Sequence, residues 1–127
     1  MNMILDTHAL IWFLSGDKNM SEKAKAAIED QGRTKFVSIA SIWEMAIKIS
    51  LGKLKIPKGF EYFLKLIEEN GFLVLPIEIE HTVVISTLDF IHRDPFDRVL
   101  IAQSKTNKIP IVTRDNTIRL YDVETIW

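Results

Sequence analysis

The sequence predicts an α/β fold with a central, mostly parallel sheet of about four to five strands, flanked by helices on both faces. Short apolar runs alternate along the chain with longer segments of helical periodicity. The short runs suit strands that are buried on both faces, as in parallel sheets. The chain has 127 residues, 47% of them hydrophobic, and no segment with the composition of a linker. We therefore expect one domain over residues 1–127.

The first half of the chain alternates strand and helix signals. The apolar run 3–5 predicts a buried strand, and Asp6 or Thr7 is expected to cap the helix that follows it. Residues 39–51 place apolar side chains at helical spacing and are closed by Gly52. The elements predicted here are a strand at 3–5, helices at 8–14 and 22–31, a strand at 35–38 and a helix at 39–51.

The second half repeats the alternation. An amphipathic segment ends at Gly71, and Pro95 suits the first position of a later helix, where a missing N–H costs nothing. The β-branched run 82–85 weakens the helical signal around it. The predicted elements are helices at 60–69, 80–91 and 95–107, strands at 72–75 and 109–113, one or two helical turns at 116–121, and a last edge strand at 123–127.

Composition excludes several classes of protein. The net charge is -1, so a nucleic-acid partner would need a local basic patch. The chain has no cysteine, which removes disulfides, zinc–thiolate sites and thiol nucleophiles and fits a reducing cytoplasm. The longest apolar run near the N-terminus, residues 9–14, is too short to span a membrane, and no membrane association is expected.

Five acidic residues occur next to predicted strand ends or helix starts. Asp94 and Asp97 open one helix, where carboxylates ordinarily accept free backbone N–H groups. Asp6 and Asp115 follow predicted strands, and Glu44 lies on the helix after another strand. Because sites in parallel sheets form beyond the carboxyl ends of the strands, Asp6 and Asp115 are expected at one edge. Topology alone does not place Asp94 and Asp97 there.

Converging carboxylates repel one another unless some are protonated or a cation lies among them. Oxygen ligands without thiolates suit a hard ion such as Mg²⁺ or Mn²⁺. Such a site lowers the pKa of bound water and holds a phosphodiester for attack. Spacing alone leaves two explanations open: a metal-dependent hydrolytic site, or separate helix caps and surface acids.

At these residues the chain resembles a PIN domain, specifically the VapC-type toxins of bacterial toxin–antitoxin pairs. The matching stretches are Leu5-Asp6-Thr7-His8, residues 38–48 with Trp43-Glu44, Gly52-Lys53-Leu54, residues 92–103, and Val112-Thr113-Arg114-Asp115. The resemblance implies a metal-dependent endoribonuclease that hydrolyses RNA phosphodiester bonds, is usually dimeric and is neutralised by a small antitoxin. It also implies that Asp6, Glu44, Asp97 and Asp115 are the catalytic, metal-binding acids. Asp94 is either a further ligand or only the helix cap.

Other polar residues near the acids are candidates for binding the RNA substrate. They are Thr7, Lys48, Arg93, Arg98 and Arg114. Cationic side chains can grip RNA phosphates, although solvated surface charge is the alternative for each of them. Thr7 is a candidate for the metal or its water and equally for capping. His8 and His92 flank acids, but the resemblance requires no histidine, so surface or packing roles are expected for both.

Two other functions compete with the nuclease. A phosphoacceptor receiver domain has a similar length, fold class and acidic Mg²⁺ pocket. It requires an acceptor aspartate at the end of the third strand, where this chain has Leu75-Pro76, and a lysine that does not follow Thr113. A non-catalytic PIN-like binding module would carry degenerate acids, and the four acids here are all present.

The number of large apolar residues predicts a homodimer. Those singled out are Trp12, Phe13, Phe60, Phe63 and Trp127. A small domain rarely buries all such side chains, and an exposed apolar patch marks an interaction site. We therefore expect a second copy of the chain to cover part of this surface.

Overall fold

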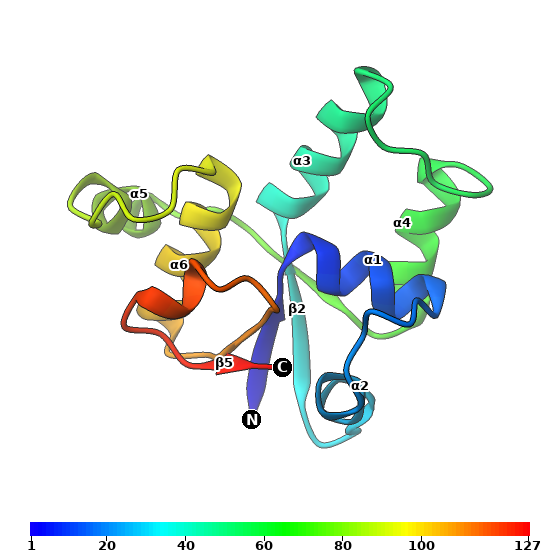
Figure 1. Ribbon diagram of the computed structural model, residues 1–127, viewed down its shortest axis with the longest axis horizontal. Coiled ribbons are helices and arrows are strands. Elements are labelled where there is room, and N and C mark those ends of the chain that lie inside the picture. The colour runs from blue at the N-terminus through cyan, green and yellow to red at the C-terminus, as the bar shows by residue number, and fades with distance from the viewer.

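Five short strands form one parallel sheet in the order β3-β2-β1-β4-β5, and six helices surround it (Figure 1). The computed structural model describes residues 1–127. The strands are β1 (Asn2–Leu5), β2 (Thr34–Ser38), β3 (Leu73–Leu75), β4 (Ile111–Val112) and β5 (Thr125–Ile126). Every neighbouring pair is parallel. The predicted fold class is confirmed, and no helix combines the length and apolar character needed to cross a membrane.

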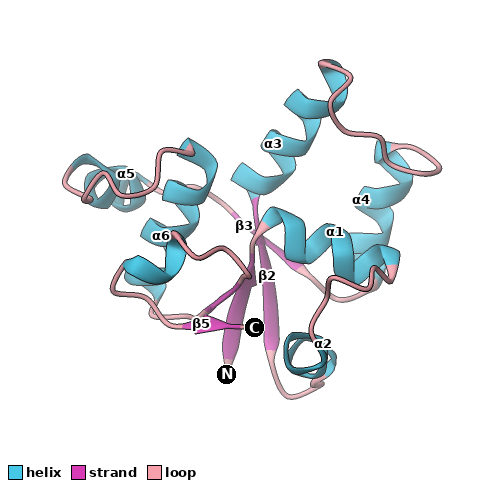
Figure 2. Ribbon diagram, in the orientation of Figure 1, coloured by secondary structure: helices cyan, strands magenta, loops and turns pink.

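The helices lie on both faces of the sheet (Figure 2). They are α1 (Thr7–Ser15), α2 (Glu22–Glu29), α3 (Ile39–Ser50), α4 (Phe60–Glu69), α5 (Ile79–Ser86) and α6 (Pro95–Asn107), with one 3-10 turn, η1 (Ile118–Leu120). Alternation along β1 divides the interior into two cores. Met3 and Leu5 face α1, α2 and α4, whereas Ile4 faces α6 and η1. Each of these side chains is fully buried, which stabilises the fold by about 1.5–3 kcal/mol per residue.

The largest disagreement with the sequence prediction is the helix expected at 80–91, which ends at Ser86. Arg98 of α6 accounts for the early end, because its guanidinium hydrogen-bonds the carbonyl oxygens of Ile85, Leu88 and Asp89. The strand predicted at 109–113 is limited to β4, because the N–H of Ile109 still bonds the helix carbonyl of Ser104 and Pro110 has no N–H.

The apolar residues singled out for a dimer interface are mostly internal. Phe63 is buried, and Phe13, Phe60 and Trp127 pack against the core beneath α1 and α4. Five of the twelve exposed large apolar side chains lie instead along the edge strand β3, the helix α5 and the turn between them. They are Leu73, Val74, Ile77, Ile79 and Val83.

Candidate metal centre

The carboxyl ends of β1 and β4 meet where the sheet order changes direction, and this junction builds the site. Asp6 follows β1 directly, and its N–H donates to the carbonyl of Val112 at the end of β4 over 3.1 Å. Asp115 lies in the loop after β4. Ligand sites of open parallel sheets form at such a point, where strands on either side run to helices on opposite faces.

Asp6 is buried and held by two hydrogen bonds. Its Oδ1 accepts from the N–H of Ala9 over 2.8 Å, so Asp6, rather than Thr7, is the N-cap of α1. Its Oδ2 accepts from the hydroxyl of Thr113 over 2.5 Å. Burial raises the pKa of Asp6, while the bonds from Thr113 and Ala9 act in the opposite direction. Both oxygens keep a lone pair for a further ligand.

Glu44 reaches the same edge from α3 and is held from both sides. The hydroxyl of Thr7 donates to Oε1 over 2.7 Å, and the Nζ of Lys48 lies 2.6 Å from Oε2. The hydrogen bond to Glu44 raises the pKa of Lys48, so this lysine stays charged beside the acid. Thr7 and Lys48 therefore orient Glu44, and the RNA contact expected of them from the sequence stays a prediction.

Packing between α3 and α6 brings Asp97 toward Glu44. The rings of Trp43 and Phe96, each next in sequence to one of these acids, meet edge to face with centroids 5.3 Å apart. Asp94 is the N-cap of α6, and its Oδ1 accepts from the N–H groups of Phe96 over 2.8 Å and of Asp97 over 3.4 Å. These contacts show that Asp94 caps α6, which is one of the two roles expected for it.

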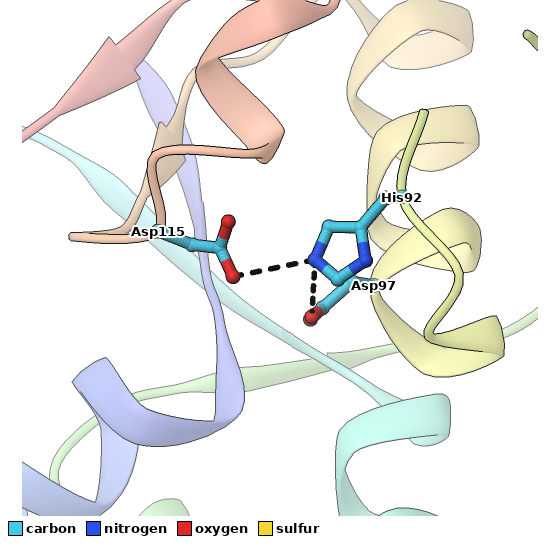
Figure 3. A group of neighbouring side chains, drawn as sticks. All are labelled: His92, Asp97 and Asp115. Carbon is cyan, nitrogen blue, oxygen red and sulfur yellow. Dashed lines mark hydrogen bonds and ion pairs between the residues drawn. The ribbon is translucent and has the colours of Figure 1, made fainter. Parts of the chain in front are cut away.

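His92 lies between two of the acids, contrary to the surface or packing role expected for it (Figure 3). Its Nε2 is 3.0 Å from Oδ2 of Asp97 and 3.2 Å from Oδ2 of Asp115. Its Nδ1 accepts the N–H of Asp94 over 3.2 Å, which assigns the ring proton to Nε2. His92 therefore donates to both carboxylates. Asp97, Asp115 and His92 place potential ligand atoms within 4.8 Å of one another, and Nε2 of His92 would bind a cation only after losing its proton.

The charges at this edge explain how the acids titrate. Burial, followed by the nearby carboxylates of Asp94, Asp6, Glu44 and Asp115, raises the pKa of Asp97 to about 8. The Nε2–H of His92 works against this shift, because it stabilises the carboxylate. Partial burial acts to raise the pKa of Asp115, but hydrogen bonds from the N–H of Ile118, from His92 and from the N–H of Thr117 outweigh it and lower the pKa.

The donor set fits a divalent cation. Asp6, Asp97 and Asp115 present carboxylate oxygens from three elements. Burial contributes most to the raised pKa of Asp97, and the repulsion from neighbouring carboxylates that adds to it is relieved when a cation lies among them. Oxygen donors with at most one imidazole are the ligands of Mg²⁺ and Mn²⁺. A cavity of about 240 Å³ opens beside these acids and is lined by Asp6, His8, Trp12, Arg114 and Asp115.

The arginines proposed for RNA binding differ in how far they are exposed to solvent. Arg93 and Arg114 are exposed, and Arg114 lines the cavity. Arg98 is buried, and its guanidinium donates to the carbonyls of Ile85, Leu88, Asp89 and His92 and contacts the Tyr121 hydroxyl. The RNA contact predicted for Arg98 is not supported by this placement. Its position in a helix start gave no sign of the loop that wraps around it.

Arg98 and Tyr121 together clamp the loop that carries His92. The Tyr121 hydroxyl accepts from the N–H groups of Ile91 over 3.0 Å and His92 over 2.7 Å, and donates to the carbonyl of Asp89 over 2.7 Å. This clamp gives the backbone of residues 88–92 the partners that a helix would otherwise provide. It thereby sets where the imidazole meets Asp97 and Asp115.

Arg98→Met is expected to destabilise the protein by about 3 kcal/mol, because buried carbonyls lose a charged donor and the methionine cannot replace it. Urea unfolding monitored by circular dichroism gives the value. Arg93→Met is the matched control at an exposed position and should stay within about 0.5 kcal/mol of the wild type. Equal stability of the two variants would show that the guanidinium does not anchor the loop.

Comparisons with known proteins agree with this architecture. A family model described as PIN domain matches residues 3–124. VapBC2 from Rickettsia felis, solved bound to a DNA fragment from its promoter, aligns with a TM-score of 0.73 at 11% identity, covering 98% of this chain and 97% of that one. DNA-bound VapBC from Salmonella typhimurium aligns with a TM-score of 0.68 at 15% identity, covering 98% and 96%.

FitAcB from Neisseria gonorrhoeae aligns with a TM-score of 0.64 at 17% identity, covering 97% of this chain and 95% of that one. No curated protein matches the sequence directly. At these identities the solved structures establish a shared fold, while the family model spans nearly the whole sequence. The chain therefore belongs to the PIN domain family.

Proposed function

We propose that this chain is a Mg²⁺- or Mn²⁺-dependent endoribonuclease that hydrolyses RNA phosphodiester bonds. The observation that carries the proposal is the convergence of Asp6, Glu44, Asp97 and Asp115 at one sheet edge, where burial and then the charges of the neighbouring acids raise the pKa of Asp97. Crowded acids of this kind are characteristic of functional sites that neutralise their charge with a ligand. The test is cleavage of RNA by the purified chain with Mg²⁺ or Mn²⁺ and its loss in chelator.

In this proposal, Asp6, Asp97 and Asp115 would hold the metal, which when bound supplies a Lewis acid and a more acidic water. Glu44 keeps its orientation through Thr7 and Lys48 and adds a buried negative charge beside the other acids. Asp94 orders the first turn of α6 and so fixes the direction of Asp97.

The RNA backbone would be held by cations around the acids. Arg93 and Arg114 are exposed at the two loops that flank the site, and Lys48 borders it through Glu44. Such contacts supply sequence-independent affinity that falls as salt increases. Because the proposed substrate is cellular RNA, the proposed place of action is the cytoplasm.

The competing functions lose support. Membership of the PIN family speaks against a receiver domain, and β3 carries no aspartate where phosphate acceptance would need one. A non-catalytic binding module would have no reason to retain the acids together, two of them buried and two partly buried, at a cost in stability. The nuclease accounts for both the residues and their placement.

We also propose that the nuclease is the toxin of a toxin–antitoxin pair, since VapBC and FitAcB share its fold. Expression of the chain alone is expected to arrest bacterial growth, and co-expression of a small antitoxin encoded beside it should restore growth. Glu44→Gln should weaken the arrest because it removes a site charge and leaves only one oxygen to accept from Thr7 or Lys48. Harmless expression of folded wild-type protein would contradict the toxin assignment.

A homodimer is proposed on the exposed apolar surface of β3 and α5. Leu73 and Val74 occupy an edge strand, and Ile79 and Val83 follow on α5 with exposed fractions of 83% and 62%. Light scattering at micromolar concentration should give twice the chain mass, and Val83→Glu should shift the mass to that of one chain. A wild-type monomer across this range would contradict the proposal.

A further inference from the structure

We propose that the cavity beside the acids is a subsite for one nucleobase of the RNA, with Trp12, His8 and Arg114 as its stacking wall. This inference rests on the proposed ribonuclease function and names how the substrate is seated. The cavity shares Asp6 and Asp115 with the candidate metal centre. A base in it therefore belongs to a nucleotide that flanks the phosphate to be cut.

Trp12 is the first reason. Its neighbours in α1, Ile11 and Phe13, pack against the core, but the Trp12 ring is not among the side chains that do so. It is surrounded instead by His8, with ring centroids 5.5 Å apart, and by Trp127, with centroids 5.9 Å apart. A large, half-buried aromatic ring that adds nothing to either core and borders an acidic site is available for a ligand.

Arg114 is the second reason. Its guanidinium lies 4.6 Å from the centroid of the Trp12 ring, and its Nη1 donates to Oδ1 of Asn19 over 3.3 Å. No carboxylate pairs with it, although Asp115 is the next residue. The guanidinium is thus held over the ring while its charge, without a carboxylate partner, remains free to meet phosphate. Unpaired bases of RNA stack on aromatic rings and on guanidinium planes of this kind.

The size of the cavity favours part of a nucleotide rather than a whole one. Its volume of about 240 Å³ is below the range of about 300–1,000 Å³ for sites that enclose a whole small ligand. One planar base fits such a space while the phosphate stays outside, at the acids. The exposed ring of His8 adds a second aromatic surface at the mouth. Stacking of this type tolerates all four bases, so weak sequence selectivity is expected from this subsite.

The experiment compares two apolar replacements of one ring in protein that binds RNA without cutting it. In an Asp97→Asn background, Trp12→Leu should weaken binding of a short single-stranded RNA by roughly tenfold, whereas Trp12→Phe should change it less than about threefold. Fluorescence anisotropy of labelled RNA gives both affinities. Arg114→Met should also weaken binding, and Arg119→Met is its matched control at an exposed position outside the cavity.

An abasic nucleotide placed beside the cleavage site completes the test. In the protein that keeps Trp12, the abasic nucleotide should weaken RNA binding by roughly tenfold. In Trp12→Leu it should weaken binding little further, because the stacking contact has already been removed. Equal losses in both proteins, or unchanged binding by Trp12→Leu, would overturn the subsite. So would a Trp12→Leu defect confined to binding of the antitoxin. Failure of the wild type to cut RNA with metal would instead overturn the ribonuclease itself.

Discussion

Asp97→Asn is expected to lower kcat/KM for metal-dependent RNA cleavage by about 100- to 1,000-fold. Lewis-acid stabilisation by a bound metal is worth several kcal/mol, and each 1.36 kcal/mol is a factor of ten in rate. Asp97 stands at the centre of the cluster, since Asp94, Asp6, Glu44 and Asp115 all act on its pKa. The measurement is cleavage of a fluorogenic RNA with Mg²⁺ or Mn²⁺, with a chelator sample as the zero.

Two asparagine controls separate ligation from other effects of the substitution. Asp94→Asn keeps the cap of α6, because asparagine caps about as well as aspartate, and it should retain activity within about tenfold. Asp30→Asn removes an acid paired with Arg33 between α2 and β2, at the opposite edge of the sheet, and should leave cleavage unchanged. Equal loss in Asp94→Asn and Asp97→Asn would make Asp94 a ligand as well as a cap. Undiminished cleavage by Asp97→Asn would contradict the metal mechanism.

Part of the site could be predicted because the end of each buried strand is a local feature of the sequence. A buried apolar run ending in Asp6, and another followed by Asp115, place both acids at the carboxyl edge as soon as the strands are parallel. Glu44 follows from its position on a helix that leaves the same edge. The position of Asp97 depends on the packing of Trp43 against Phe96, and residue spacing in the sequence does not predict that contact.

His92 and Arg98 were assigned other roles because tertiary contacts decide them. His92 precedes the helix cap, and the only local signal is that its Nδ1 accepts the N–H of Asp94. Arg98 occupies a helix turn where a basic residue ordinarily faces solvent, yet the loop after α5 wraps over it. The same contacts end α5 early. One group of tertiary hydrogen bonds therefore explains why the end of α5 and the role of Arg98 were both predicted wrongly.

Asp97→Asn is also expected to stabilise the metal-free protein, an effect that unconnected caps would not produce. A carboxyl whose pKa is raised in the folded state destabilises that state once the pH exceeds its unfolded value, near 3.9. For Asp97 the penalty grows from about pH 4 and is complete above about pH 8. Asparagine carries no charge and avoids it. At pH 4 the variant should therefore have no advantage, and at pH 8 the advantage should be largest.

The expected size follows from opposing contributions. A shift of several pKa units corresponds to several kcal/mol, reduced by the His92 contact and by about 0.3–1 kcal/mol for the lost charge at the start of α6. A net gain on the order of 2 kcal/mol in chelator at pH 8 corresponds to a rise in Tm of roughly 5–10 °C. Thermal unfolding by circular dichroism between pH 4 and pH 9 measures it.

Metal should reverse the order of the two proteins. Binding to the folded state stabilises the wild type by about 2.7 kcal/mol at a hundred times Kd, while Asp97→Asn should respond much less. Asp6→Asn should gain less than Asp97→Asn in chelator, because both Asp6 oxygens are already bonded, to Ala9 and to Thr113, and an amide cannot accept at both positions. If Asp97→Asn is equally stable at pH 4 and pH 8 relative to wild type, and responds equally to metal, the acids do not share a charge-neutralising ion. A pH-dependent gain that metal abolishes would instead mean that the carboxylates that repel one another in the metal-free protein are the same groups that bind the cation.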